Sequence, residues 1–319
     1  MLQPTISIII PAFNEEANIS LLFEKISTLL FKEDYEIIFI DDGSTDKTAA
    51  EIQKLSQNYP QVKGISFSRN FGHQAALKAG LDYARGDCAL SLDCDLEHPP
   101  EILLEMLSLW RNGIEVVICK RENNSRLPIF KKISSRIFYT LLNLISETSV
   151  EPGTADFRLL DKKVVEVCKA ITENELFWRG IIPWLGFKTK TIGYQQSQRK
   201  HGESKYTLIK MIRLSVAGIT SFSIKPLYLA LYLGAFFATT SFLYLIYTLG
   251  IKLFTNESVS GWASLIASVL LIGGVQLLIL GVMGIYLGKL FMQSKGRPQY
   301  VIRNTFPESR SDQELKKAS

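Results

Sequence analysis

Ala89-Leu-Ser-Leu-Asp-Cys-Asp-Leu-Glu97 is the stretch of sequence that decides the fold. It is a short apolar run that leads into two carboxylates, Asp93 and Asp95, spaced two residues apart. An apolar run of this length predicts a buried strand, so the acidic pair is expected at the strand's end. Such oxygen ligands suit Mg²⁺ or Mn²⁺, which proteins usually complete with substrate phosphates and water. An ordinary solvated turn can contain the same pair, so the surroundings decide its meaning.

The acidic stretch lies within an alternation of predicted strands and helices. Strands are predicted at 6–10, 35–40, 62–67, 88–92 and 116–119, and helices at 14–30, 48–58, 71–84 and 100–111. Asn14 is the predicted cap of the first helix. The alternation predicts an α/β fold with a mostly parallel sheet that is covered on both faces.

The acidic residues follow two of these strands. Asp41 and Asp42 come after the second strand, whereas Asp93 and Asp95 come after the fourth. Ligands of parallel sheets bind beyond the carboxyl ends of the strands, so these carboxylates are expected to converge on one site. For Asp41 and Asp42 two interpretations stay open, because Asp-Gly-Ser also suits a plain turn, while a carboxylate there suits a nucleobase or ribose.

Two long uncharged segments, 227–250 and 262–288, follow the α/β region. At about 1.5 Å per residue, the shorter segment reaches roughly 36 Å, and a bilayer core is about 30 Å thick. We therefore expect two transmembrane helices, and the alternative is a pair of buried helices in a soluble protein. Basic residues flank both segments, while the loop 251–261 holds one Lys and one Glu. The positive-inside rule then places both termini in the cytoplasm, at the inner membrane.

These features predict how the chain is organised. Residues 1–206 form a cytosolic α/β domain, 207–226 an interfacial amphipathic helix, and 289–319 a cytosolic tail after the second span. The net charge of +5 is modest, and its basic residues cluster near the membrane segments. Anionic lipid headgroups are therefore the expected partner, rather than nucleic acid.

The histidines and cysteines indicate neither a zinc site nor a disulfide framework. His98 and His201 lack metal-ligand spacing, and His73 is interpreted as structural. No CxxC pair occurs among the four cysteines, which fits a reduced cytosolic domain.

Three further stretches each allow two interpretations. The bases after the fifth strand form either a solvated loop or a phosphate clamp for an acceptor at the membrane surface, and the lipid-like partner favours the clamp. Asp156, in Gly153-Thr-Ala-Asp-Phe-Arg158, is either a general base or the ion-pair partner of Arg158. The basic loop 199–206 is either a lid over a diphosphate or a linker.

Five motifs occur in a fixed order along the chain. They are Pro11-Ala-Phe-Asn-Glu-Glu16, Asp41-Asp-Gly-Ser-Thr-Asp46, Asp93-Cys-Asp-Leu-Glu-His-Pro-Pro100, Gly153-Thr-Ala-Asp-Phe-Arg158 and Arg199-x-x-Gly-x-Ser-Lys-Tyr206. Together they resemble the family-2 glycosyltransferases that load a sugar onto polyprenyl phosphate, in particular bactoprenol glucosyltransferases and dolichol-phosphate mannose synthases. The resemblance covers roughly residues 4–290. It implies a Rossmann-like GT-A fold, a nucleotide-sugar donor, a divalent metal and inversion at the anomeric carbon.

The resemblance also implies roles for individual residues. The nucleotide-sugar site would comprise Pro11, Phe13, Glu15, Asp41, Asp42, Asp93, Arg199 and Lys205. The metal, Mg²⁺ or Mn²⁺, would be held by Asp93, Asp95 and Glu97, and family members often have Gln at the last position. The acceptor phosphate would meet Arg121, Arg126, Lys131 and Ser135. Asp156 is the family's candidate base, and it would act catalytically together with Asp93 and Asp95.

The expected reaction is the metal-dependent, inverting transfer of one hexose to membrane polyprenyl phosphate, such as undecaprenyl phosphate. UDP-glucose is the first-choice donor, because the two-span pattern resembles the glucosyl group of the family. The second pKa of a phosphate monoester is about 6, so the acceptor needs no strong base. Glycines of the second span permit close helix approach, so a homo-oligomer is expected.

Two rival functions are considered. A processive polysaccharide synthase usually carries a Gln-x-x-Arg-Trp motif and more spans, whereas this chain has Phe177-Trp-Arg-Gly180 and two spans. A non-catalytic membrane scaffold that binds nucleotide sugars or lipid phosphates would not need the intact acidic set.

Overall fold

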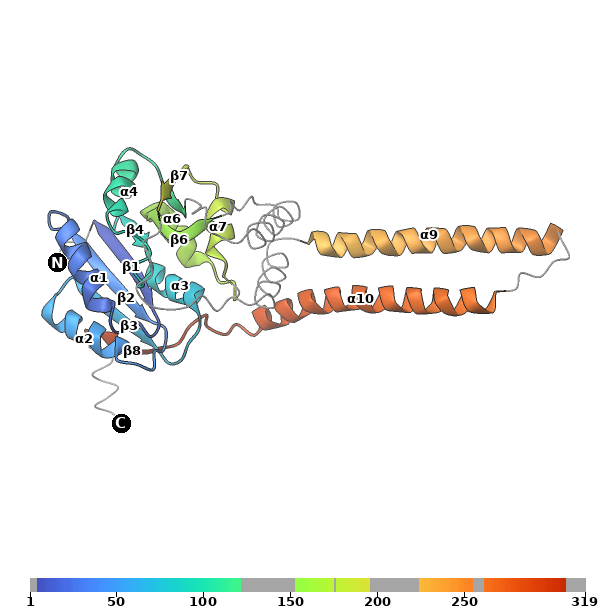
Figure 1. Ribbon diagram of the computed structural model, residues 1–319, viewed down its shortest axis with the longest axis horizontal. Helices are drawn as coiled ribbons and strands as arrows, with labels where there is room; N and C mark the ends of the chain where they lie inside the picture. Colours follow the sequence, from blue (N-terminus) through green and yellow to red (C-terminus); the bar gives the residue numbers. More distant parts are fainter. Residues whose placement is uncertain (1–4, 122–152, 175, 196–223, 255–260, 308–319) are drawn as a thin grey trace. The chain divides into compact units, whose positions relative to one another are not determined.

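The computed structural model describes residues 5–121, 153–174, 176–195, 224–254 and 261–307 (Figure 1). These residues divide into two compact units. The first holds the described residues up to 195 together with 297–307, and the second holds those from 224 to 296. The first unit is an α/β domain, and the second is a pair of long helices.

The first unit is built on an eight-stranded sheet of described residues, in the order β7-β5-β6-β4-β1-β2-β3-β8. Only β6 and β8 run antiparallel to their neighbours, so the predicted mostly parallel sheet is confirmed. The five predicted strands correspond to β1 to β5. The strands are β1 Ile6–Ala12, β2 Tyr35–Asp41, β3 Val62–Phe67, β4 Cys88–Ser91, β5 Val116–Arg121, β6 Thr154–Asp161, β7 Thr189–Tyr194 and β8 Ile302–Phe306.

Helices cover both faces of this sheet (Figure 1). One face packs against α1 Ile19–Leu29, α2 Thr48–Asn58 and α4 Ile102–Arg111 in a single apolar core. The other face carries α3 His73–Tyr83, α6 Lys162–Ala170 and α7 Trp178–Trp184. All seven residues of β1 are buried, which is typical of a central parallel strand between two helical layers.

Helix α3 lies unusually close to the centre of the sheet because of a glycine. A Cβ atom added at Gly80 would lie 2.1 Å from Cγ2 of Ile9 in β1. The missing side chain therefore lets the helix backbone approach β1 directly. This close packing also fixes the position of the first turn of α3 relative to the carboxyl edge of the sheet.

The sequence predicts only a tail in 289–319, but part of that range belongs to the sheet. Strand β8 pairs antiparallel with β3 and covers its edge. Tyr300 stacks on Phe67 with ring centroids 5.1 Å apart, and Arg303 Nη2 donates to Ser68 O at 2.8 Å. A strand of five residues with three consecutive polar side chains shows no alternation that could reveal it from the sequence.

The second unit consists of α9 Lys225–Phe254 and α10 Trp262–Ser294, which run side by side (Figure 1). Leu227–Tyr244 and Leu271–Ser294 are long and apolar enough to cross a membrane. Only 6% and 0% of the residues in these stretches are buried, so the alternative of two buried core helices is wrong for them. The predicted interfacial helix at 207–226 lies outside the described residues, except for its last three positions.

Candidate active site

The predicted acidic residues gather at one edge of the sheet. Strands β1, β2, β4 and β5 run parallel and end there, while the antiparallel β6 begins there. This arrangement puts Asp41 and Asp42, after β2, on the same edge as Asp93 and Asp95, after β4. It also brings in Asp156 from the start of β6, which no predicted strand located. The expected convergence of the acidic residues at one sheet edge is therefore confirmed.

Asp41 and Asp42 are both buried and both hold loops in place. Asp41 accepts hydrogen bonds from Ser44 N at 2.9 Å and from Ser66 Oγ at 2.6 Å. Asp42 accepts from Phe71 N at 2.7 Å and from Gly72 N at 2.9 Å. Burial raises the pKa of Asp42, against the lowering effect of these two backbone donors. The turn interpretation of these two residues is therefore confirmed, and their binding of a nucleobase or ribose stays a prediction.

The residues at the end of β1 and just after it also lie at this edge of the sheet. Pro11 is buried in the last part of β1, whereas the Phe13 ring is 44% exposed. Glu15 is tied in twice, since its N donates to Thr48 Oγ1 at 2.9 Å and its Oε2 accepts from Asn18 Nδ2 at 2.5 Å. An exposed aromatic ring at a sheet edge offers a flat surface on which a nucleobase can stack.

Asn14 does not cap a helix, contrary to the prediction. The helix begins only at Ile19, and Asn14 adopts a left-handed backbone with φ of 56°. Its Oδ1 accepts from Thr45 N at 2.9 Å, and its own N donates to Ser44 Oγ at 2.9 Å. Asn14 therefore joins the loops that follow β1 and β2, a pairing that a local capping rule does not detect.

The turn after β4 is held by a buried histidine. Asp93 N donates to His98 Nδ1 at 3.1 Å, and Glu97 N donates to Asp95 Oδ1 at 3.0 Å. The His98 ring stacks on Phe157 with centroids 4.9 Å apart, and its burial lowers its pKa. A neutral imidazole can accept the backbone hydrogen bond that orients Asp93.

The predicted metal ligands differ in their partners. Glu97 is buried and forms an ion pair with Arg121, with Oε2 and Nη2 3.2 Å apart, whereas the Asp93 side chain is 37% exposed. Within the described residues, no group of three or more His, Cys, Asp or Glu side chains is arranged to hold a metal ion. The assignment of Asp93, Asp95 and Glu97 as metal ligands stays a prediction, and carboxylates at this edge have the oxygen chemistry that Mg²⁺ or Mn²⁺ prefers.

Asp156 sits in a cage of hydrogen-bond donors. Arg158 pairs with Oδ1, while Arg179 Nη2 lies 3.1 Å from Oδ2 and Gln74 Nε2 donates to Oδ2 at 3.3 Å. Burial by itself raises the pKa of this carboxyl, but the charges of Arg158 and Arg179 outweigh burial and lower it to about 2. Asp156 is therefore ionised, strongly stabilised and weakly basic. Of the two interpretations of Asp156, the ion pair with Arg158 is confirmed.

His73 lies between Asp93, which follows β4, and Asp156 at the start of β6. Its Nε2 is 3.6 Å from Asp93 Oδ1 and 3.7 Å from Asp156 Oδ2, and its side chain is 39% exposed. The interpretation of His73 as structural did not anticipate this position, nor did the sequence single out Gln74 or Arg179. A usable signal was available, since His73 follows the carboxyl end of a predicted strand, where ligands bind.

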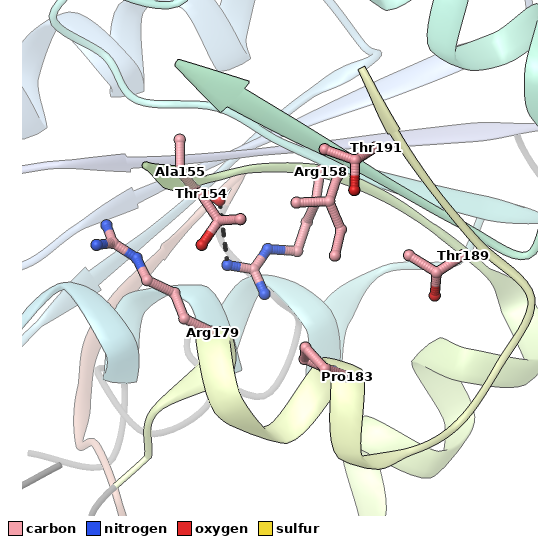
Figure 2. A pocket seen from close by; sticks show the side chains of 8 residues that line it. Thr154, Ala155, Arg158, Arg179, Pro183, Thr189 and Thr191 are labelled. Carbon is pink, nitrogen blue, oxygen red and sulfur yellow. Dashed lines mark hydrogen bonds between the residues drawn. The ribbon is translucent and has the colours of Figure 1, made fainter. Parts of the chain in front are cut away.

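A cavity of about 230 Å³ opens beside Asp156, between β5, β6, β7 and α7. Figure 2 shows Arg158 reaching into it from β6, with Arg179 and Pro183 on α7 and with Thr189 and Thr191 on β7. Arg158 Nη2 also donates to Ala155 O at 3.4 Å. The lining combines guanidinium groups with hydroxyls, which suits a polar or anionic ligand.

Five predicted site residues lie outside the part of the chain that the structure describes. Three belong to the predicted acceptor-phosphate site and two to the predicted lid over the donor. They are Arg126, Lys131, Ser135, Arg199 and Lys205.

Comparisons with known proteins place this site in a family context. Residues 7–168 match the family described as Glycosyl transferase family 2. The chain is 42% identical over 302 residues to an uncharacterized glycosyltransferase, YkcC, of Bacillus subtilis, covering 94% of each chain. It is 40% identical to a bactoprenol glucosyl transferase of Shigella phage SfV, covering 94% of this chain and 98% of the relative. A prophage bactoprenol glucosyl transferase homolog of Escherichia coli is 37% identical, and the match covers 93% of this chain and 98% of the relative.

Solved structures are more distant. The glucosyl-3-phosphoglycerate synthase of Mycobacterium tuberculosis, in complex with Mn²⁺, UDP-glucose and phosphoglyceric acid, is 20% identical with a TM-score of 0.47. The match covers 68% of this chain and 78% of that one. At this distance the likeness assigns no ligand to any residue of the present chain.

Proposed function

The chain belongs to glycosyl transferase family 2, and from this premise we propose that it transfers one hexose from a nucleotide diphosphate sugar to polyprenyl phosphate, with inversion at the anomeric carbon. The relatives named bactoprenol glucosyl transferase match along most of its length, which supports a lipid-phosphate acceptor. Their name also supports glucose as the hexose, and UDP-glucose is our first-choice donor.

The hydrogen bonds and ion pairs that Asp156 accepts from Arg158, Arg179 and Gln74 are the observation that carries this choice of acceptor. A hydroxyl acceptor must lose its proton as it attacks, and a carboxylate with a pKa of about 2 is poorly matched to that task. A phosphate monoester has a second pKa of about 6 and is largely ionised at neutral pH. Its oxygen can attack the anomeric carbon directly, so the site needs a positioned acceptor more than a base.

The donor side of the proposal uses the loops after β1, β2 and β4. Phe13, with Pro11 and Glu15 beside it, would line the nucleoside together with Asp41 and Asp42. Asp93 and Asp95 would hold Mg²⁺ or Mn²⁺ with the donor diphosphate. Such an ion would offset the charge that builds on the departing diphosphate. Glu97 would contribute through its ion pair with Arg121 rather than as a third ligand.

The acceptor side uses basic residues near the same edge. The guanidinium of Arg121 is 46% exposed beside Glu97 and can meet a phosphate bidentately. Arg126, Lys131 and Ser135 complete this acceptor site in our proposal, and Arg199 and Lys205 cover the donor phosphates. The support for these five residues is the order of the motifs in the sequence alone.

In this proposal the two apolar helices anchor the protein in the membrane. We propose that α9 and α10 both span the cytoplasmic membrane, with the catalytic domain and both termini in the cytoplasm, because the basic flanks follow the positive-inside rule. A lipid phosphate held beside a bound donor gains effective molarity without new chemistry. Gly273, Gly274, Gly281 and Gly284 permit close helix approach, so we also propose a homo-oligomer.

Transfer by the purified full-length protein tests this function. The protein is incubated with labelled nucleotide hexoses, Mg²⁺ and polyprenyl phosphate, and the lipid product is weighed by mass spectrometry. We expect a product with one hexose, and little product from an Asp93→Asn, Asp95→Asn variant. A long polymer would instead indicate a polysaccharide synthase. A protein that binds donor but transfers nothing would be a scaffold, and either result would refute the proposal.

A further inference from the structure

His73 lies between the carboxylates of Asp93 and Asp156 at the carboxyl edge of the sheet. We propose that this imidazole contacts the hexose during transfer and helps to select which hexose is accepted. The inference rests on the proposed function, because it assigns a residue to the substrate of that reaction.

The first observation is geometric. His73 Nε2 is 3.6 Å from Asp93 Oδ1, on the donor side, and 3.7 Å from Asp156 Oδ2, on the other side. Both distances exceed that of a normal hydrogen bond, so the imidazole stands within ion-pair range of both carboxylates without a close hydrogen bond to either. The side chain is 39% exposed, so a ligand at the sheet edge can reach it.

The second observation is that the backbone on both sides of His73 is fixed. Before it, Phe71 N and Gly72 N both donate to the buried Asp42, and Gly72 has a φ of 98°, which favours glycine. After it, Gln74 Oε1 accepts from Trp178 N at 3.0 Å, and Trp178 Nε1 donates to Gln74 O at 3.1 Å. Such support holds a side chain in place before a ligand arrives, as binding sites require.

The third observation concerns which substrate group fits between the two carboxylates. The diphosphate belongs at Asp93 and Asp95, and the group that passes from donor to acceptor is the hexose. A sugar hydroxyl both donates and accepts, so it can donate to a carboxylate while it bonds the imidazole.

The fourth observation removes the rival candidate for this role. The Asp156 carboxylate is already bonded by Arg158, Arg179 and Gln74, so it is committed to holding its neighbours. Asp156 therefore acts as a positioning residue for the arginines and for Gln74. His73 is left as the side chain that faces the hexose from α3.

Replacing His73 tests the inference in the full-length protein. His73→Ala should lower kcat/KM for the preferred hexose donor by about tenfold or more, because a recognised hydroxyl loses its partner. The ratio of kcat/KM for that donor to kcat/KM for its epimers should also fall. The Kd for UDP should stay within about twofold of the wild-type value, because the nucleotide is bound elsewhere. His73→Gln, which keeps a polar group at similar reach, should recover part of the loss. Tyr83→Ala, at the exposed far end of α3, is the matched control.

Each outcome decides the inference. Unchanged kcat/KM and epimer preference in His73→Ala would overturn it, as would an equal loss of affinity for UDP alone. A lowered melting temperature without a change in epimer preference would also overturn it and leave His73 structural. If the wild-type protein uses another acceptor, the proposed function fails, yet the epimer preference of the variant on that acceptor still tests His73.

Discussion

Asp156 shows how a single residue changes its meaning between sequence and structure. Its motif allows a general base, but its carboxylate is bonded by Arg158, Arg179 and Gln74 and has a pKa of about 2. The charge of Asp156 stabilises the buried Arg158, which also donates to Trp178 O at 3.0 Å. Asp156 therefore holds Arg158, Arg179 and Gln74 in position, and the reaction does not rely on it as a proton acceptor.

Asp156→Asn should lower turnover and leave donor binding intact, because the cage of donors loses its central charge while the loops after β1, β2 and β4 are untouched. The free energy of unfolding should also fall by about 3 kcal/mol, since Arg158 keeps a buried charge without a partner. Steady-state kinetics, donor titration and denaturation of the purified protein measure these effects. Wild-type turnover in this variant would show that Asp156 has no role in the reaction.

A second substitution separates stability from reactivity. Adding Arg158→Met to Asp156→Asn removes both buried charges together. The double variant should lose less stability than the sum of the two single variants, because the pair is coupled. Additive losses would contradict a stabilising Asp156–Arg158 pair.

The pH dependence of the reaction gives an independent prediction. Asp156 has a lowered pKa, from 3.8 to about 2, so its contribution to stability is present above about pH 4 and is lost as the pH falls toward 2. It therefore does not titrate near neutrality. The rate should instead rise with pH through about 6, where the acceptor phosphate becomes a dianion. Rate–pH profiles of wild type and Asp156→Asn should share this rise, and its loss in the variant would identify Asp156 as the titrating base.

The sequence predicted the acidic residues of the site but not their partners. Asp41, Asp42, Asp93 and Asp95 follow recognisable strands, so topology alone brings them together. His73, Gln74 and Arg179 have no such pattern. Their roles depend on contacts with Asp156, which reaches the site only because β6 runs antiparallel to β4. No local periodicity encodes that reversal.

At the scale of elements, α3 links the core of the domain to the site. Gly80 brings the helix against Ile9 of β1, and the first residue of the same helix is His73. Because α3 packs directly on β1, the position of its first turn relative to the carboxyl edge of the sheet is fixed. Packing in the core therefore sets the position of a side chain in the site.

Gly80→Ala should destabilise the domain. The added methyl would lie 2.1 Å from Ile9 Cγ2, and such overpacking costs about 1–3 kcal/mol, more than the roughly 1 kcal/mol that alanine adds in helix propensity. Thermal unfolding of the purified protein measures the change. Tyr83→Ala, on the exposed end of the same helix, should stay within about 0.5 kcal/mol of wild type. Equal or higher stability of Gly80→Ala would contradict the close packing.

The parallel half of the sheet was predictable because each strand is a continuous apolar run between helices. Strands β1 to β5 match their predictions to within a few residues. The others were missed for physical reasons. Strand β7 has mostly exposed side chains, and β8 is separated from its partner β3 by most of the chain. Pairing over such distances in sequence leaves no local signal.

At the scale of the whole molecule, the second unit differs from the first in what it leaves exposed. In the described residues of α9 and α10, large apolar side chains such as Phe236, Leu243, Leu277 and Leu278 are more than half exposed. Exposed apolar surface of this extent requires an apolar surrounding. The length of both helices is enough to cross a lipid bilayer, which supports the proposed membrane location.

The protein should therefore remain in the membrane pellet after an alkaline carbonate wash, because two spanning helices are held by their apolar surface. A cysteine introduced at Asn256, between the two segments, should react with an impermeant thiol reagent from outside intact cells. The four native cysteines are buried, so they give a low background. Release by carbonate, or labelling only after lysis, would contradict the proposed topology.

The most direct measurement compares two acceptors that differ in one group. Purified wild-type protein receives the same nucleotide hexose with either polyprenyl phosphate or the matching polyprenol, near pH 7 and with Mg²⁺. If the site positions an acceptor that is already ionised, hexose appears on the phosphate and the alcohol stays unmodified. Comparable transfer to the alcohol would mean that the enzyme activates a hydroxyl with a competent base, and the account of Asp156 would be wrong.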